Sequence, residues 1–353
     1  MQGFSAELLR TRPKQFDLRR GVLDAILILT PLVVGFALGL AEAAVIVSIG
    51  ALNFALVEAP TPKDGRGKVL AVTVVANSAA FGAGTLVGLT PVEVEIPLVA
   101  AGVFVALLGV GSSRWELTSF IAAVMFSFAV GIPPTTLAGV VLRPLGVLLG
   151  GTWCLLAFVL LELSPKRLPA RMRPKVADLP PARDAPVRVV VGHGAVVALT
   201  VVVGLLIGAR LGLPRDYWVM VTVLVALRFD LVGTLSISVA RILGTIVGAA
   251  GAFVVTTLTA DPWILFPILA ATTALTIASR AVNYVVYAVW VTLTIILLLN
   301  LVYSGGPQLA IARVIDTVIG GGLAMVAVLL LTAARRRPRR VHNALPHAAN
   351  RAG

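Results

Sequence analysis

Charged residues are scarce in this chain, and acidic ones are scarcer than basic ones. Only 13% of the 353 residues are charged, with 29 lysines and arginines against 16 aspartates and glutamates. A soluble globular protein would have about 25% charged residues. Hydrophobic residues make up 58%, and the mean hydropathy is +0.99. The composition excludes an ordinary water-soluble fold and indicates an integral membrane protein.

Cysteine and histidine are nearly absent, which excludes several kinds of chemistry. Cys154 has no second cysteine to pair with, so a disulfide within the chain is excluded. The three histidines do not form a cluster with metal-ligand spacing, so we expect no metal and no cofactor. The stretch "KDGRGKVL" lacks the first glycine and the hydroxyl of a phosphate-binding loop. No paired carboxylates or nucleophile elbow stand out. We therefore expect a protein that is not an enzyme, and an enzyme acting on lipid is the least supported alternative.

Long apolar runs fill most of the chain. Twelve are long enough to be considered as membrane-spanning helices, so we predict an all-α, polytopic helical bundle. The first run follows a basic arm and can itself span, so it does not read as a cleavable signal peptide. The predicted segments are roughly 21–40, 43–58, 69–89, 96–111, 115–131, 139–163, 189–210, 216–232, 239–259, 262–279, 281–303 and 310–333.

The basic residues sort to one side of these segments. If the N-terminus is cytoplasmic, most of the 29 lysines and arginines fall at cytoplasmic ends. This distribution follows the positive-inside rule and predicts a multi-pass protein of the cytoplasmic membrane with both termini in the cytoplasm. The net charge of +13 is then a topology signal and a means of contacting anionic membrane lipids. We expect no nucleic-acid partner.

A proline-rich polar stretch divides the chain into two halves. It reads "SPKRLPARMRPKVADLPPARDAP" and begins at Ser164. Its prolines and charges predict an extended cytoplasmic linker. We predict a basic arm (1–20), a first six-span unit (21–163), the linker (164–188), a second six-span unit (189–333) and a basic tail (334–353).

The two halves share basic landmarks at nearly constant spacing. Lys68 and Arg241 are 173 residues apart, and Arg143 and Arg313 are 170 apart, within "RPLGVLLGG" and "RVIDTVIGG". With six spans each, the halves would be parallel repeats about an axis along the membrane normal. Four such cations near that axis would form a positive path for anions. Lys68 and Arg241 could instead extend toward lipid phosphate at the membrane surface. Arg313 could instead form a local salt bridge with Asp316. The first half has Gly146 at the position that corresponds to Asp316.

Further polar residues within the spans are candidates for the same path. Asp24 and Asp316 could relay protons, although Asp24 lies near a span end and also fits an interfacial carboxylate. Asn283, Tyr287 and Trp290 follow one another on a single helical face. The tyrosine fits an interfacial aromatic belt. Trp290 lies deeper, where it could stack on a flat substrate ring.

The stretch "YWVMVTVLVALRFDLVGTLSISVARILGTIVGAAGA", from Tyr217, carries a family resemblance. It combines a tryptophan start, a short Gly-Thr turn, and Arg-Ile-Leu-Gly-Thr followed by further glycines. It resembles the fusaric acid resistance and aromatic acid exporter superfamily. The second half, about 187 to 333, fits that family's six-span unit, whereas the first half has Lys68 for the arginine and no Gly-Thr. The matching residues are Trp218, Gly233, Thr234, Arg241, Gly244, Thr245 and Gly248.

The resemblance implies efflux of aromatic or other organic carboxylates along a path between the two halves. Plant aluminium-activated malate transporters are distantly similar. The expected partners are a small organic anion and membrane lipids, and assembly into a homo-oligomer is a further possibility. The alternatives are a passive anion channel and a non-transporting membrane scaffold subunit.

Overall fold

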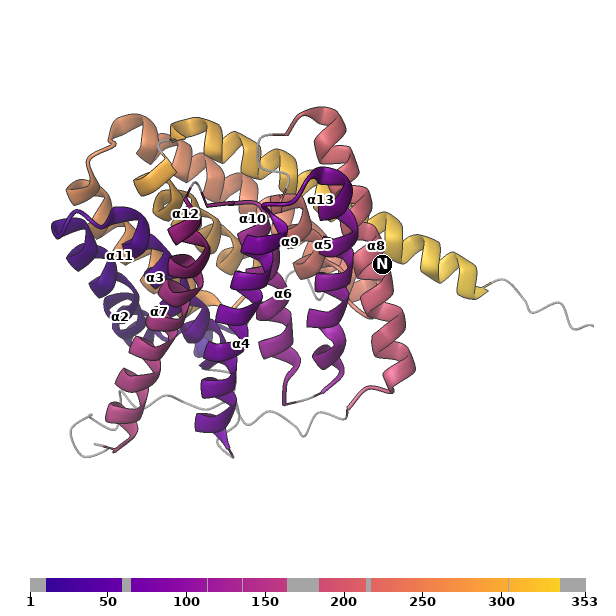
Figure 1. Cartoon of the computed structure of the whole chain (residues 1–353), viewed down its shortest axis with the longest axis horizontal. Helices are drawn as coiled ribbons and strands as arrows, with labels where there is room; N and C mark the ends of the chain where they lie inside the picture. The colour runs from indigo at the N-terminus through magenta and orange to yellow at the C-terminus, as the bar shows by residue number, and fades with distance from the viewer. Residues whose placement is uncertain are drawn as a thin grey trace, which may run out of the picture.

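The apolar runs form helices, because in lipid each backbone N–H and C=O must be satisfied within its own segment. The computed structural model describes residues 11–58, 65–112, 114–134, 136–163, 184–213, 217–303 and 305–336. Within these ranges the fold is entirely helical (Figure 1). The predicted arm up to residue 10, most of the linker (164–183) and the tail from 337 lie outside them. The helices are η1 (Pro13–Gln15), α2 (Leu18–Ala37), α3 (Ala41–Glu58), α4 (Arg66–Val87), α5 (Val92–Leu107), η2 (Leu108–Gly111), α6 (Glu116–Val130), α7 (Leu137–Leu163), α8 (Val187–Leu211), α9 (Tyr217–Ala226), α10 (Leu231–Leu258), α11 (Pro262–Ser279), α12 (Tyr284–Tyr303) and α13 (Gly306–Arg336).

The prediction of an all-α membrane bundle is confirmed. In the described part of the chain, ten helices are long and apolar enough to cross a membrane, and each of the twelve predicted segments contains a helix. The two shorter ones are α6, with 15 residues, and α9, with 10. Ten helical residues rise only about 15 Å, which is half of a hydrocarbon core of about 30 Å.

The boundary between α9 and α10 differs from the prediction. The segment predicted at 216–232 ends as a helix at Ala226, and the next helix begins at Leu231 instead of 239. The carboxylate of Asp230 accepts a hydrogen bond from Gly233 N at 2.7 Å and so caps α10. Gly233 and Thr234 therefore lie in the first turn of α10 and do not form a turn between helices. Apolar residues on both sides of the break conceal it in the sequence.

Helices that hold the same place in the order of the two predicted halves make similar contacts. In the first half α3 packs on α7, and α4 packs on α6 and α7; in the second half α9 packs on α13, and α10 packs on α12 and α13. The contacts between halves also occur in matching pairs, α2 with α11 and α8 with α5, then α3 with α12 and α9 with α6. Thr73 and Thr118 share a hydrogen bond at 2.7 Å between α4 and α6, and Thr245 and Thr292 share one at 3.4 Å between α10 and α12.

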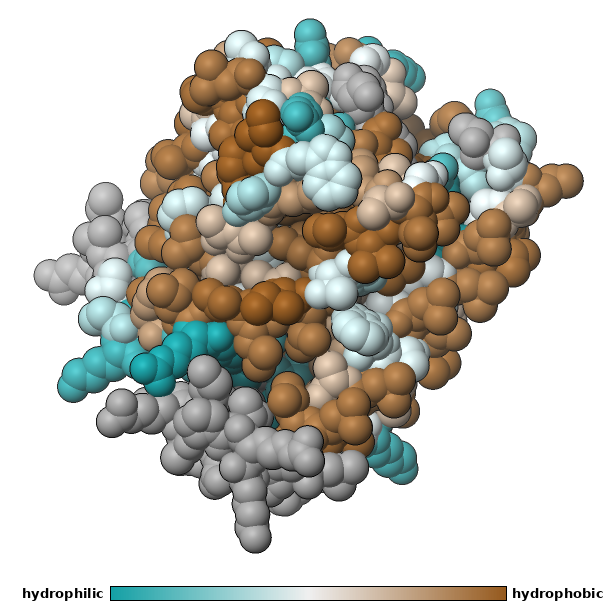
Figure 2. Space-filling model, turned by 90° about the vertical axis from the view of Figure 1, so that its left-hand side faces the viewer, coloured by the Kyte–Doolittle hydropathy of each residue, from teal (hydrophilic) through white to brown (hydrophobic). Residues whose placement is uncertain are grey.

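Burial distinguishes central helices from peripheral ones. In α3, 72% of the residues are buried, and in α9 all residues but Val225 are buried. Peripheral helices instead expose large apolar side chains, such as Leu137 at 89% and Leu258 at 79%. Figure 2 shows one face of the molecule, largely covered by hydrophobic residues. Extensive exposed apolar surface would cause aggregation in water, but it suits a protein surrounded by lipid.

An apolar groove of about 610 Å³ runs between α2 and α11, where the two halves meet. Its lining extends from Val22 to Val34 on α2 and from Phe266 to Ala274 on α11. Thr30 is the one polar residue in its lining. The groove therefore offers apolar contact and no charged group for an anion.

Candidate anion-binding site

Two buried arginines come together in the second half. Arg241 of α10 is 6% exposed, and Arg313 of α13 is 3% exposed. Arg241 Nη1 donates a hydrogen bond to Tyr284 Oη at 3.2 Å, and the guanidinium carbon of Arg313 lies 3.9 Å from the centre of the Trp218 ring. The two guanidiniums are close enough to repel each other electrostatically. We call Trp218, Arg241, Tyr284 and Arg313 the buried arginine site.

Glycines in α10 bring the site together. A Cβ at Gly248 would lie 2.4 Å from Val289 O of α12, and one at Gly244 would lie 2.5 Å from Ala288 Cβ. Only glycine permits helices to approach each other this closely. Because α10 and α12 lie this close, Tyr284 at the start of α12 comes within reach of Arg241.

Arg241 lies deeper in its helix than the sequence suggested. The predicted span placed it at a helix entrance, but α10 begins ten residues earlier, at Leu231. That separation is about 15 Å along the helix axis. A side chain this far from the helix start, with only 6% exposure, is not placed for snorkelling from the entrance of α10.

Trp218 is held by other aromatic rings. Its ring centre lies 4.9 Å from that of Tyr217 and 5.7 Å from that of Phe128 of α6. These contacts fix the face on which Arg313 rests, an arrangement that favours a cation. In the sequence Trp218 stood out as part of the family motif, and the aromatic candidate for a substrate ring was Trp290. Trp290 is partly buried and packs against the apolar core.

Positive charge exceeds negative charge in the buried arginine site. Asp316, 1% exposed, lies one turn after Arg313 and attracts it electrostatically. One carboxylate thus faces two guanidiniums. Arg241 Nε and the Nε and Nη1 of Arg313 donate no hydrogen bond within the described part of the chain. Buried donors without acceptors are costly, so this arrangement suits an incoming anion.

Lys68 and Arg143 occupy other surroundings. Lys68 is exposed in the first turn of α4, and Arg66, two residues earlier, is the buried cation there. Arg143 Nη1 donates to Ile132 O and its Nη2 to Glu42 Oε1, both at 2.5 Å. The acidic partner of Arg143 therefore comes from α3. The sequence could not indicate this partner, because the residue one turn after Arg143 on α7 is Gly146.

The remaining predicted residues have local roles in the structure. The side chain of Asn283 accepts hydrogen bonds from the backbone N–H groups of Val285 and Val286 at 2.8 and 3.3 Å, so it caps α12. Thr234 accepts a hydrogen bond from Arg228 N at 2.9 Å and donates to Asp230 O at 2.8 Å. It thereby secures the junction of α9 and α10.

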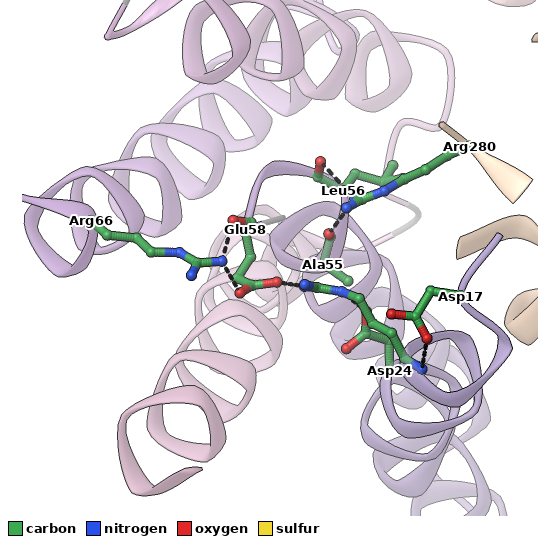
Figure 3. A network of polar contacts seen from close by, with 8 residues as sticks. Asp17, Asp24, Ala55, Leu56, Glu58, Arg66 and Arg280 are labelled. Atoms are coloured by element: carbon green, nitrogen blue, oxygen red, sulfur yellow. Dashed lines mark hydrogen bonds and ion pairs between the residues drawn. The ribbon is translucent and has the colours of Figure 1, made fainter. Parts of the chain in front are cut away.

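A second polar cluster lies where α2 and α4 begin and α3 and α11 end (Figure 3). Glu58, the last residue of α3, forms an ion pair with Arg66 through Oε1 and with Arg20 through Oε2. Arg20 also donates to Asp24 at 3.3 Å. Arg280 Nη1 donates to Ala55 O at 3.1 Å and to Leu56 O at 3.4 Å. We call Arg20, Asp24, Glu58, Arg66 and Arg280 the α3-end cluster.

Arg280 connects this cluster to the buried arginine site. Arg280 lies within electrostatic range of Arg20, Arg66 and Tyr287, and Tyr287 lies within range of Arg241. Burial, followed by repulsion from Arg20, lowers the pKa of Arg280 to about 10. Arg280 therefore stays charged at neutral pH. Cations thus follow one another from the end of α3 to Trp218.

Among the described residues, no group of three or more His, Cys, Asp or Glu side chains could hold a metal ion. Among the described residues of the second half, the buried polar side chains are arginines, serines, threonines, Asn300 and Asp316. The arginines and hydroxyls can bind and orient an anion.

Comparison with known proteins supports the family resemblance. A sequence model of the family described as fusaric acid resistance protein-like matches residues 195–327. No curated protein and no solved structure gives a significant match. The match covers α9 to α12 and most of α8 and α13, and with them the buried arginine site. Over residues 195–327 the chain is thus similar to the fusaric acid resistance protein-like family, and this similarity suggests a membrane transporter.

Proposed function

We propose that this protein exports small organic anions, with aromatic carboxylates as the preferred class. The observation that carries the proposal is the buried arginine site, where two guanidiniums share their surroundings with Trp218 and Tyr284. Buried guanidiniums with unused donors are costly, so a protein that keeps two of them side by side needs them for a ligand or a path.

The chemistry of the substrate class matches that of the site. Carboxylic acids with a pKa of about 4 are anions in the cytoplasm and cross lipid poorly. A guanidinium can bind a carboxylate through two parallel hydrogen bonds, and an aromatic face beside it can hold a ring. A membrane potential that is negative inside drives an anion outward with about 2.3 kcal/mol per charge per 100 mV. Export can therefore proceed without a second ion.

The two halves contribute unequally in this proposal. The duplicated helix contacts and threonine pairs support an origin as parallel repeats. If Thr73 corresponds to Thr245, then Val69, which is buried, takes the place of Arg241 in the first half. The anion site therefore belongs to the second half, and the first half supplies the opposing wall through α3 and α6.

Electrogenic transport in proteoliposomes tests the proposal. We would compare 4-hydroxybenzoate, fusarate, malate and chloride for the wild type, Arg241→Ala, and Arg210→Ala as a control at an exposed arginine. We expect saturable currents for the aromatic acids that are lost in Arg241→Ala and kept in Arg210→Ala. Non-saturating currents for every anion, unchanged in Arg241→Ala, would indicate a passive channel. No current from folded wild-type protein would favour the scaffold.

A further inference from the structure

The α3-end cluster gathers three guanidiniums at the end of α3. Its central carboxylate, Glu58, is 5% exposed, and Asp17 and Asp24 lie beside Arg20 (Figure 3). Each oxygen of Glu58 is bound to a different arginine, and Arg66 Nη2 also donates to Glu58 O at 2.7 Å. Figure 3 shows Arg66 and Arg280 approaching the end of α3 from opposite sides.

The cluster joins elements of both halves at the end of a central helix. Arg20 comes from α2 and Arg66 from α4, while Arg280, from the second half, donates to the last carbonyls of α3. Tyr287 lies near both Arg280 and Arg241 and so is between the two sites. By the distribution of basic residues, this end of the bundle faces the cytoplasm. An anion leaving the cytoplasm would meet these cations before it reached the buried arginine site.

We propose that the α3-end cluster is a second binding site for the transported carboxylate, in which Glu58 occupies the position that the substrate's carboxylate takes. This inference rests on the proposed function, because it concerns the same substrate. The exchange is chemically balanced, since one carboxylate replaces another and the two guanidiniums keep an anionic partner. If the two guanidiniums had no carboxylate partner, their buried positive charge would be uncompensated. Substrate entry thereby releases Glu58, and with it the link among α2, α3 and α4.

Glu58→Gln tests the inference, because glutamine keeps the shape but loses the charge that competes with the substrate. We expect a several-fold lower KM for 4-hydroxybenzoate in proteoliposomes. We also expect a larger rise of the melting temperature on adding 4-hydroxybenzoate to the purified protein. The matched control is Glu42→Gln, which weakens the Arg143 pair at the other end of α3 and should leave both values unchanged. Glu58→Asp, which keeps the charge, should resemble the wild type more than Glu58→Gln does.

The outcomes separate this inference from the proposed function. An unchanged or raised KM in folded Glu58→Gln, with no larger melting shift, would overturn it and leave Glu58 as a structural ion pair. The proposed function would survive that result if Arg241→Ala still abolished transport. Conversely, a wild type that neither transports nor binds 4-hydroxybenzoate, fusarate or malate would remove the basis of both.

Discussion

At the scale of single residues, the partner of each arginine decides its role. Arg241 and Arg313 contact aromatic groups and keep unused donors, whereas Arg143 is bound by Glu42 and by Ile132 O. Glu42 is 53% exposed, so its pair with Arg143 contributes little to stability after solvent screening. The pairs of Glu58 are buried, and breaking one would leave an uncompensated charge.

Replacing Trp218 tests the aromatic part of the buried arginine site. Trp218→Leu removes the ring beneath Arg313, and Trp218→Phe keeps a smaller one. A cation–π contact away from water is worth about 1–2 kcal/mol, so we expect KM for 4-hydroxybenzoate to rise roughly five- to thirtyfold in Trp218→Leu. Trp218→Phe should lie between it and the wild type. Equal KM values for the three proteins in the proteoliposome assay would show that the ring does not take part.

At the scale of elements, close helix approach positions the polar groups. Gly244 and Gly248 let α10 approach α12, and a Cβ at Gly320 would lie 2.8 Å from Val219 O, so α13 is equally close to α9. In lipid such contacts replace the hydrophobic effect as the source of helix association. The break after α9 belongs to the same scale, because it lets α10 begin early and carry Arg241 inward.

Gly248→Ala should separate α10 from α12. Its Cβ would meet Val289 O at 2.4 Å, and backbone cannot move aside as a side chain can. We expect a loss of about 1–3 kcal/mol of stability, seen as a lower melting temperature, together with weaker transport as Tyr284 moves from Arg241. The control is Gly322→Ala, also in a membrane helix, where a Cβ meets no atom within 4 Å. Equal effects of both substitutions would contradict this account.

At the scale of the whole molecule, the α3-end cluster faces the cytoplasm only if the predicted topology is right. Labelling with a membrane-impermeant thiol reagent tests it. In a Cys154→Ser background, Lys175→Cys in the linker should react only after the cytoplasmic side is opened. Thr90→Cys, between α4 and α5, should react in intact cells. The reverse pattern would invert the topology, and with it the direction proposed for the anion.

The helical content and its approximate segments could be predicted from the sequence. Composition and run length are local properties, and lipid leaves an apolar segment few alternatives to a helix. The sequence placed Arg241 at a helix entrance, so only the burial of Arg313, which lies in an apolar segment, was foreseeable. The start of α10 was not, since it depends on the side-chain hydrogen bonds of Asp230 and Thr234.

By itself, the sequence determined that the protein is a multi-span helical bundle with arginines inside apolar helices and a family motif around Trp218 and Arg241. Only the tertiary structure decided which groups meet. It brought Trp218 to Arg313, Tyr284 to Arg241, Glu42 to Arg143, and Glu58 to Arg20 and Arg66. Most of these partners come from helices that are distant along the chain. The physical reason is that helix packing in lipid is set by shape and close approach, which apolar sequence barely records.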